Sequence, residues 1–323
     1  MLPPFGLFSI AIRRLASRSE PMSDWMPELS EDDRKQAFLD WRDQVRKDLS
    51  NVICPFLRRS GGGQRPTWDG IPIVEAEEII KAELDVIIQN FQGSAPTIRD
   101  KAPVISSPEF GSTQLEQFLV EDKPSQPAAI NLRDYVSGLS QEQFEKTRAA
   151  VDDAYSSKKL PGLFWFKNEF MRVRPHQAAL ILGREDFINY PALSARHSSF
   201  CSGHCLEGIL FSAAIEEYWR SSSVSYSPVQ LEELAQYAVD FGDRRVFAGV
   251  HYPSDNIGSW IISLRLAKYI FSDSGQTLAF IRRAIIEKSK VFEVIDVQYE
   301  KFEALVPLRN LLRIELSMDD VIS

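Results

Sequence analysis

The sequence predicts an all-α protein, because apolar residues recur at helical spacing in most long segments and alternating strand patterns are scarce. Of its 323 residues, 44% are hydrophobic and 25% are charged, a balance typical of a folded globular chain. The chain shows no internal repeat of the kind that indicates a solenoid. We therefore expect a bundle of packed helices.

The N-terminal half contains two strongly periodic segments. In the first, Ser30 stands before an acidic run, as an N-cap residue does. Four apolar residues then follow at helical spacing: Phe38, Trp41, Val45 and Leu49. The second segment, residues 73–91, has one apolar face, made of Ile79, Ile80, Leu84, Ile87 and Ile88. Three glycines at 61–63 predict a flexible turn between the two helices.

The remaining elements follow from capping signals and periodicity. Residues 93–127 are rich in proline and serine, which predicts a loop with one short helix at 114–120. Ser140 and Gln143 form a capping-box pattern, so a helix should begin there and continue to residue 155. Further helices are expected at 163–171, 204–219, 228–241, 253–271 and 276–297, and an amphipathic stretch around Leu308, Leu311 and Leu312 should pack on the bundle.

Residues 1–21 differ in character from the rest of the chain. Three arginines, Arg13, Arg14 and Arg18, stand among apolar and serine residues with a single acid, Glu20, and this resembles an organelle transit segment. The alternative is a start at Met22 that leaves an unstructured extension. We expect a helical extension at 22–130, packed on a helical catalytic core at 131–323. The expected location is cytoplasmic, or an organelle if residues 1–21 act as a targeting segment.

Charge and cysteine content exclude several classes of protein. The formal net charge of −8 argues against a broad nucleic-acid surface, although it leaves room for a local basic pocket. The three cysteines, Cys54, Cys201 and Cys205, are too few for a disulfide framework and suit a reducing compartment. Cys201 and Cys205 flank a Ser-Gly-His sequence at a spacing that could serve metal or redox chemistry, but small packing residues are the favoured interpretation.

No apolar run is long enough to span a bilayer. The best candidate, residues 257–271, is interrupted by Arg265 and Lys268, so it predicts a packed helix rather than a transmembrane segment.

The first of three chemically suggestive segments ends in Arg174-Pro175. Lys167 and Arg174 are seven residues apart, a spacing that would place them on one helical face, two turns apart. Two cations on one face could hold a dianion. A solvated basic stripe explains this segment equally well.

The second segment is Ser199-Phe-Cys201-Ser202-Gly203-His204, which leads into an apolar helix. The hydroxyl of Ser202 and the free amides of the first helical turn favour an anion there. His204 would point into the same space. The alternative is an ordinary N-cap with an incidental histidine.

The third segment runs from Arg245 through His251-Tyr-Pro253 to Asp255. Because His251 and Asp255 are four residues apart, the carboxylate can accept from one imidazole nitrogen and leave the other free. Pro253 suits a first helical turn, and Arg245 adds a permanent fork for phosphate oxygens. A surface His–Asp pair is the alternative.

Together the three segments resemble the signature of the type-2 phosphatidic acid phosphatase and vanadium haloperoxidase superfamily: Lys167-x6-Arg174-Pro175, Ser202-Gly203-His204 and Arg245-x5-His251-x3-Asp255. The resemblance implies a helical bundle whose motifs converge on one phosphate or vanadate pocket, and the lack of a bilayer-spanning run leads us to expect a soluble member. It also implies roles. The phosphate would be bound by Lys167, Arg174, Ser202, Gly203 and Arg245. His251 would attack phosphorus, His204 would act as general acid and Asp255 would orient His251.

Two positions depart from the family pattern. Cys201 stands where the family often has proline, which leaves the geometry of that turn undefined. Arg244 stands where serine often precedes the motif arginine, and it could add anion affinity or face solvent. Neither position carries a direct catalytic group.

The resemblance leads us to expect a metal-independent phosphatase that hydrolyses a phosphomonoester or a prenyl or lipid diphosphate through a phosphohistidine. No cofactor is required for that reaction. The alternatives are a haloperoxidase whose vanadate is ligated by His251, a prenyl-diphosphate cyclase and a non-catalytic anion-binding protein. The expected partner is a small or amphiphilic phosphate substrate, with no nucleic acid, and the sequence defines neither that substrate nor an oligomeric state.

Overall fold

The computed structural model describes residues 30–50, 67–68, 71–92, 136–147, 149, 163–170, 172–188, 198–222, 224–271, 273–298 and 303–317. Within these residues the regular structure is helical apart from one antiparallel pair, β1 (Thr67–Trp68) with β2 (Ile71–Pro72). The predicted all-α class is confirmed. The predicted transit segment at 1–21, the turn at 61–63 and the loop at 93–127 lie outside the described residues.

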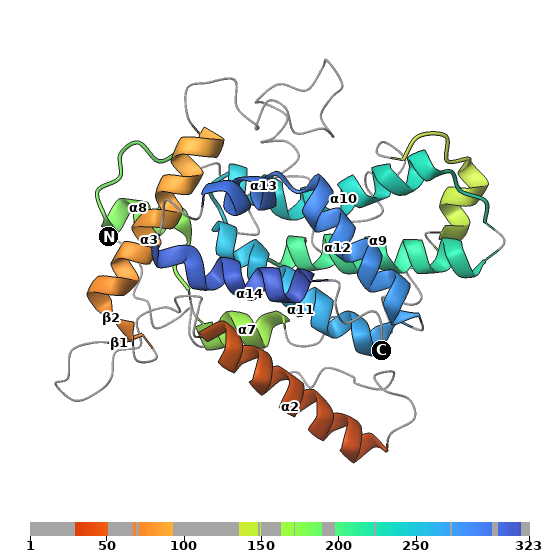
Figure 1. Cartoon of the computed structure of the whole chain (residues 1–323), viewed down its shortest axis with the longest axis horizontal. Coiled ribbons are helices and arrows are strands. Elements are labelled where there is room, and N and C mark those ends of the chain that lie inside the picture. The colour runs from red at the N-terminus through yellow and green to blue at the C-terminus, as the bar shows by residue number, and fades with distance from the viewer. Residues whose placement is uncertain are drawn as a thin grey trace, which may run out of the picture.

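Two helices in the N-terminal part of the described chain form as the periodicity predicts. Helix α2 spans Glu31–Ser50, and the Ser30 hydroxyl accepts a hydrogen bond from the Asp33 amide at 3.2 Å. Its predicted apolar face is buried. Helix α3 spans Ile73–Ile87 and continues into a π-helical turn, η1 (Ile88–Gln92). In Figure 1, α2 lies along one edge of the molecule and α3 lies at one end.

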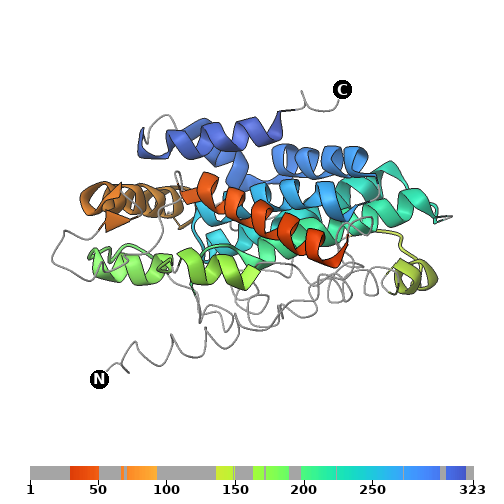
Figure 2. The ribbon, with the colours of Figure 1, turned by 90° about the horizontal axis from the view of Figure 1, so that it is seen from below.

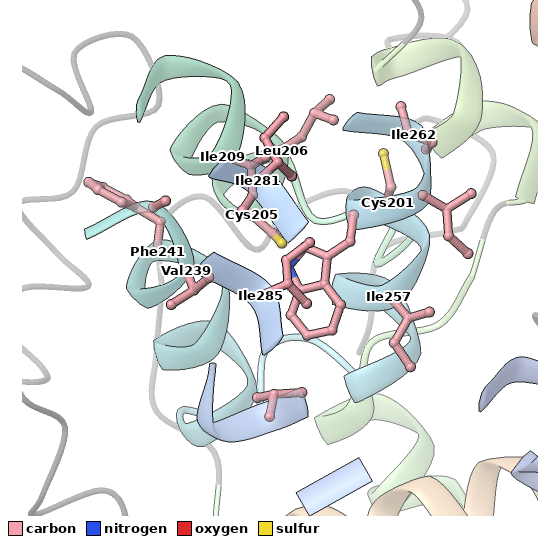
Figure 3. Packing of buried hydrophobic residues seen from close by; sticks show 14 of the residues in the cluster. Cys201, Cys205, Leu206, Ile209, Val239, Phe241, Ile257, Ile262, Ile281 and Ile285 are labelled. Atoms are coloured by element: carbon pink, nitrogen blue, oxygen red, sulfur yellow. The ribbon is translucent and has the colours of Figure 1, made fainter. Parts of the chain in front are cut away.

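Four long helices form the centre of the molecule: α9 (Gly203–Ser221), α10 (Pro228–Phe247), α11 (Pro253–Ile270) and α12 (Ser274–Lys288). They pack on one another, with α9 and α10 making the most extensive contact. Their shared interior is aliphatic and aromatic, and Figure 3 shows Leu206 and Ile209 from α9 close to Ile281 from α12. Burial of this surface from water is the main stabilising contribution to such a core.

Shorter helices cover this centre from opposite sides. They are α7 (Leu163–Phe170), α8 (Pro175–Ile181), α13 (Lys290–Gln298), η4 (Glu303–Leu305) and α14 (Val306–Leu316). Figure 2 shows α14 on one face of the bundle and α7 with α8 toward the other. Leu308 and Leu312 of α14 are buried, as the amphipathic pattern predicts.

The predicted helix at 276–297 is wrong in one respect, because the structure has two helices separated at Ser289. The buried carboxylate of Asp243 causes the break. It accepts hydrogen bonds from the Ser289 hydroxyl at 2.9 Å and from the Lys290 amide at 2.7 Å. These contacts satisfy donors at the start of α13 that would otherwise lack partners.

Several other predicted helix starts are confirmed, whereas the ends are less closely predicted; the end expected at residue 155 lies outside the described residues. Ser140 and Gln143 form the expected reciprocal capping box, and residues 141–147 are helical. Helix α10 is longer than predicted, continuing to Phe247 with a second capping box at Ser227 and Gln230. Among the described residues, no helix combines the length and the apolar character needed to cross a bilayer.

Candidate active site

The N-terminus of α9 forms one wall of the site. Ser202 is its N-cap, and the Ser202 hydroxyl accepts a hydrogen bond from the Cys205 amide at 3.4 Å. Gly203 is the first helical residue, and His204 follows it with a buried side chain. The free amides and the positive end of the helix dipole therefore lie beside an imidazole, as the second motif predicts.

Lys167 and Arg174 reach the site differently from the prediction. They do not share a helix, because α7 ends at Phe170 and Arg174 is the extended N-cap of α8. They converge instead on the segment before α9. Lys167 Nζ donates to the carbonyl oxygens of Ser198 at 3.1 Å and Cys201 at 2.6 Å, and Arg174 Nη2 donates to the Ser198 carbonyl at 3.3 Å.

Each motif histidine is paired with one motif arginine. Arg245, in the last turn of α10, places its Nη2 atom 2.5 Å from Nε2 of His204. Arg174 places Nη1 2.9 Å from Nε2 of His251 and donates to the Val250 carbonyl at 2.7 Å. Both guanidinium groups are buried, so the cations predicted to bind phosphate lie against the histidines predicted to act on it.

His251 and Asp255 form the predicted hydrogen bond, with 3.0 Å between Nδ1 and Oδ2. Asp255 lies in the first turn of α11, which begins with Pro253 as predicted. Because Asp255 accepts at Nδ1, the proton of a neutral His251 resides there, and Nε2 keeps its lone pair toward Arg174. This tautomer leaves Nε2 as the nucleophilic atom.

Several further groups hold the Asp255 carboxylate in place by hydrogen bonds, and the three motifs did not predict a role for them. Arg172 Nη1 donates to Asp255 Oδ1 at 2.7 Å, and the Tyr252 amide donates to Oδ2 at 3.0 Å. The Ser199 hydroxyl also donates to Oδ2. Arg172 in turn forms a buried ion pair with Glu83 of α3. Arg172 lies within the first motif segment, but motif spacing alone does not mark it.

Electrostatics favour a neutral imidazole and a charged carboxylate. Burial, and then the positive charge of Arg174, hold the pKa of His251 well below its ordinary value of 6.5, although Asp255 opposes the shift. Burial alone would raise the pKa of Asp255. The charge of Arg172 and the hydrogen bond from His251 outweigh burial and lower that pKa below its ordinary value. The pair therefore resembles a histidine nucleophile and the carboxylate that orients it.

Lys167 is the cation of the site whose charge is most sensitive to its surroundings. Burial, and then repulsion from Arg174, lower the pKa of Lys167 to about 7. The negative ends of three backbone carbonyl groups surround its Nζ atom. A bound anion would add negative charge beside this buried ammonium group and so stabilise its charged form.

The other residues that the sequence analysis discussed have no role in the proposed chemistry. Cys201 and Cys205 are free and buried, and burial raises the pKa of Cys201 to about 11. They are therefore thiols packed in the core, as favoured from the sequence. Arg244 does not face solvent, because it is buried, and its Nη2 atom lies 3.7 Å from Oδ2 of Asp240. His176 is half-buried on α8.

The structure therefore brings the three motifs together at one place, with two histidines, three cations and a helix N-terminus. The predicted site residues lie there in a connected set of contacts: Lys167, Arg174, Ser202, Gly203, His204, Arg245, His251 and Asp255. Within the described part of the chain, no group of three or more histidine, cysteine or acidic side chains is arranged to hold a metal ion. Buried cations beside paired histidines are suited to binding and attacking a phosphoryl group.

Comparison with known proteins agrees with this geometry. The family model described as the PAP2 superfamily matches residues 160–277. That range contains every predicted site residue and Arg172, whereas Glu83 lies outside it. The searches of curated proteins and of solved structures found no match.

Proposed function

We propose that this chain, a member of the PAP2 superfamily through residues 160–277, hydrolyses a phosphomonoester or a prenyl or lipid diphosphate through a phosphohistidine intermediate. Phosphatase-type activity is the general activity that the family suggests. The observation that carries the specific proposal is the geometry of His251. Its Nδ1 atom is held by Asp255, while Nε2 lies 2.9 Å from the guanidinium of Arg174.

Substrate binding is the first step of the proposed reaction. The phosphoryl oxygens take positions among Lys167, Arg174 and Arg245 and at the α9 N-terminus, where cations and amides stabilise their charge. A dianion attracts both guanidinium groups more strongly than a neutral imidazole does. Its binding therefore frees Nε2 of His251 for attack. It also frees Nε2 of His204, which takes a proton from solvent in the first cycle and from the hydrolytic water in later cycles.

In the chemical step, Nε2 of His251 attacks phosphorus, and the bond from phosphorus to the leaving oxygen breaks. His204 donates its proton to that oxygen, so the leaving group departs as a neutral alcohol or a protonated phosphate. Asp255 stabilises the positive charge that develops on the His251 ring. Water then attacks phosphorus, His204 accepts the water proton, and the bond from phosphorus to Nε2 of His251 breaks with its electron pair returning to Nε2. The products are inorganic phosphate and free His251.

The proposed function is tested by phosphate release from a panel of phosphomonoesters and prenyl diphosphates, with and without a metal chelator. The native chain should release phosphate equally in both conditions, and His251→Ala should release none. The matched control is His176→Ala, which removes a histidine that we do not place in the reaction and should retain activity. Release that needs added metal, or that survives in His251→Ala, would contradict the proposal.

The two histidine roles can be separated by the leaving group. p-Nitrophenolate departs without a proton, whereas an alkoxide does not. His204→Ala should therefore slow hydrolysis of an alkyl phosphate far more than that of p-nitrophenyl phosphate. A rapid acid-free quench with labelled substrate should retain label on native protein and none on His251→Ala.

The other reactions that this motif set suggests are distinct outcomes of the same experiments. Bromide oxidation by vanadate-loaded protein, without phosphate release, would identify a haloperoxidase. A cyclic hydrocarbon product from a prenyl diphosphate would identify a cyclase. Anion binding without any turnover would identify a binding protein.

A further inference from the structure

Helix α3 reaches the candidate active site through one carboxylate. Glu83 is completely buried, and its Oε2 atom forms an ion pair with Nη2 of Arg172. Its other oxygen, Oε1, accepts a hydrogen bond from the Ser254 amide at 2.9 Å. Ser254 lies in the first turn of α11, so Glu83 satisfies an amide next to the catalytic carboxylate. A buried charge with two such contacts has a fixed orientation.

Arg172 is held from several directions. Nη1 donates to Asp255 Oδ1 at 2.7 Å and to the Ser254 hydroxyl at 2.6 Å. Its guanidinium carbon also lies 4.0 Å from the centre of the Tyr252 ring, a cation–π distance. The planar fork of arginine therefore links two carboxylates from helices α3 and α11. A lysine could not reproduce this geometry.

The contacts form one continuous path to the proposed nucleophile. Glu83 binds Arg172, Arg172 binds Oδ1 of Asp255, and Oδ2 of Asp255 accepts from Nδ1 of His251. We propose that Glu83 and Arg172 are positioning residues for the reaction, which act through Asp255 on His251; this inference rests on the proposed function. Glu83 lies outside the residues matched by the family model, so the functional unit extends into α3.

The charges of the buried trio explain why Glu83 matters beyond geometry. Two carboxylates and one guanidinium carry a net charge of −1 when all are ionised. That charge faces His251 through Asp255 and stabilises the ring as it becomes positive during attack. Without the charge of Glu83, the remaining pair of Arg172 and Asp255 is neutral, and Asp255 is the only charged partner left for Arg172 among these three groups. Asp255 then becomes a weaker acceptor for His251.

Loss of Glu83 should lower the rate of the chemical step without weakening substrate binding. Glu83 and Arg172 make none of the described contacts of Lys167, Arg174 or Arg245. Glu83→Gln should therefore lower kcat about 10–100-fold, as loss of an outer partner of an active-site histidine commonly does. KM and the inhibition constant of inorganic phosphate should stay within about twofold of native. A variant that merely loosens the fold would change all three.

The matched control is Asp48→Asn. Asp48 comes from the other described N-terminal helix, α2, and pairs with Arg265 of α11 at 2.6 Å. It therefore also joins an N-terminal helix to the core through an arginine, whose described side-chain partners are Asp48 and Glu315 and not the residues around His251. Asp48→Asn should keep native kcat. Equal loss of kcat in Glu83→Gln and Asp48→Asn would overturn the inference.

A double variant tests whether Glu83 acts through Arg172. Arg172→Lys should lower kcat by itself, and adding Glu83→Gln should lower it little further, because the path is already broken. Independent multiplication of the two losses would overturn the inference. Should Glu83→Gln fail to fold, Glu83→Asp keeps the charge on a shorter side chain and serves in its place, with a smaller loss of kcat than Arg172→Lys.

A turnover-free measurement separates this inference from the proposed function. In full-length protein with 15N-labelled histidine, the Nδ1-bound proton of His251 can be assigned with His251→Ala. Its signal should move upfield or broaden by exchange in Glu83→Gln and stay unchanged in Asp48→Asn. An unchanged signal in Glu83→Gln would overturn the positioning role. If native protein releases no phosphate, the proposed function fails, and this signal still decides the role of Glu83.

Discussion

The charge of Lys167 should make anion binding depend on pH near neutrality. Burial and Arg174 lower the pKa of Lys167 to about 7 in the free protein. Below pH 7 the Lys167 side chain is mainly an ammonium ion, and above pH 7 it is increasingly a neutral amine. An anion that binds beside Nζ needs the ammonium form, so binding at higher pH requires uptake of one proton.

The size of the effect follows from that pKa. If only the ammonium form binds, the apparent Kd rises about tenfold per pH unit above 7, and about 100-fold between pH 6 and pH 9. The apparent Kd stops rising with pH once the anion binds mainly to protein that carries the neutral amine. Loss of one charge 4 Å from an anion costs about 4 kcal/mol at an effective dielectric of 20, nearly a thousandfold. The increase should therefore continue through pH 9.

Inorganic sulfate is a suitable probe because it stays a dianion throughout this range. Calorimetric titration of full-length protein at pH 6, 7, 8 and 9, at constant ionic strength, gives Kd directly. Repeating it in two buffers of different ionisation enthalpy counts the proton taken up. Lys167→Arg is the matched control, because a guanidinium stays charged over the whole range.

In Lys167→Arg, the sulfate Kd should be nearly independent of pH. Other groups near Lys167, namely Arg174, Cys201, Glu207 and Asp255, are unchanged in this variant. A native Kd that changes less than twofold between pH 6 and pH 9 would refute the argument. An equal slope in native protein and Lys167→Arg would refute it as well, since another group would then carry the titration.

Three further predictions, one of them with a control variant, test the surroundings of His251 and the core. Gly249→Ala should lose about 3 kcal/mol in urea unfolding, from a positive φ of 71° and a Cβ only 2.7 Å from Phe187. Gly183→Ala, with a similar φ but open space, should lose about 1 kcal/mol, and equal losses would exclude the clash. Asp243→Ala should lose about 3 kcal/mol in the same assay, because it orphans two amides and a hydroxyl at the start of α13; a loss under about 1 kcal/mol would contradict that role. Asp255→Asn should lower kcat about 10⁴-fold, as when the carboxylate of a catalytic triad is replaced, and a tenfold loss or less would show that Asp255 does not set the tautomer.

Local sequence signals predicted most helices, because capping residues and helical periodicity act over a few residues. Ser30 and Ser140 begin helices where their capping patterns place them. The break at Ser289 was not predictable in this way. It depends on Asp243, which is 46 residues earlier in the chain and meets Ser289 only after α10 and α13 have packed together.

The same distinction applies to the candidate site. The His251–Asp255 contact was predictable, because four residues of backbone determine it. Lys167 and Arg174 were expected together for the wrong reason, since the helix between them ends at Phe170. What brings them together is a set of carbonyl oxygens in the segment before α9, and no spacing rule encodes that segment's path.

The position of Glu83 in the sequence is unusual, but motif spacing alone does not identify it as a site residue. It lies in the apolar stripe of α3, between Ile80 and Leu84, where a carboxylate is costly unless it is paired. Such a residue predicts a buried cation elsewhere in the chain, but not which one. Arg172 is 89 residues later. An acid inside an apolar stripe, together with an arginine inside an anion-binding motif, is therefore the joint signal in the sequence for the proposed role of α3 at the active site.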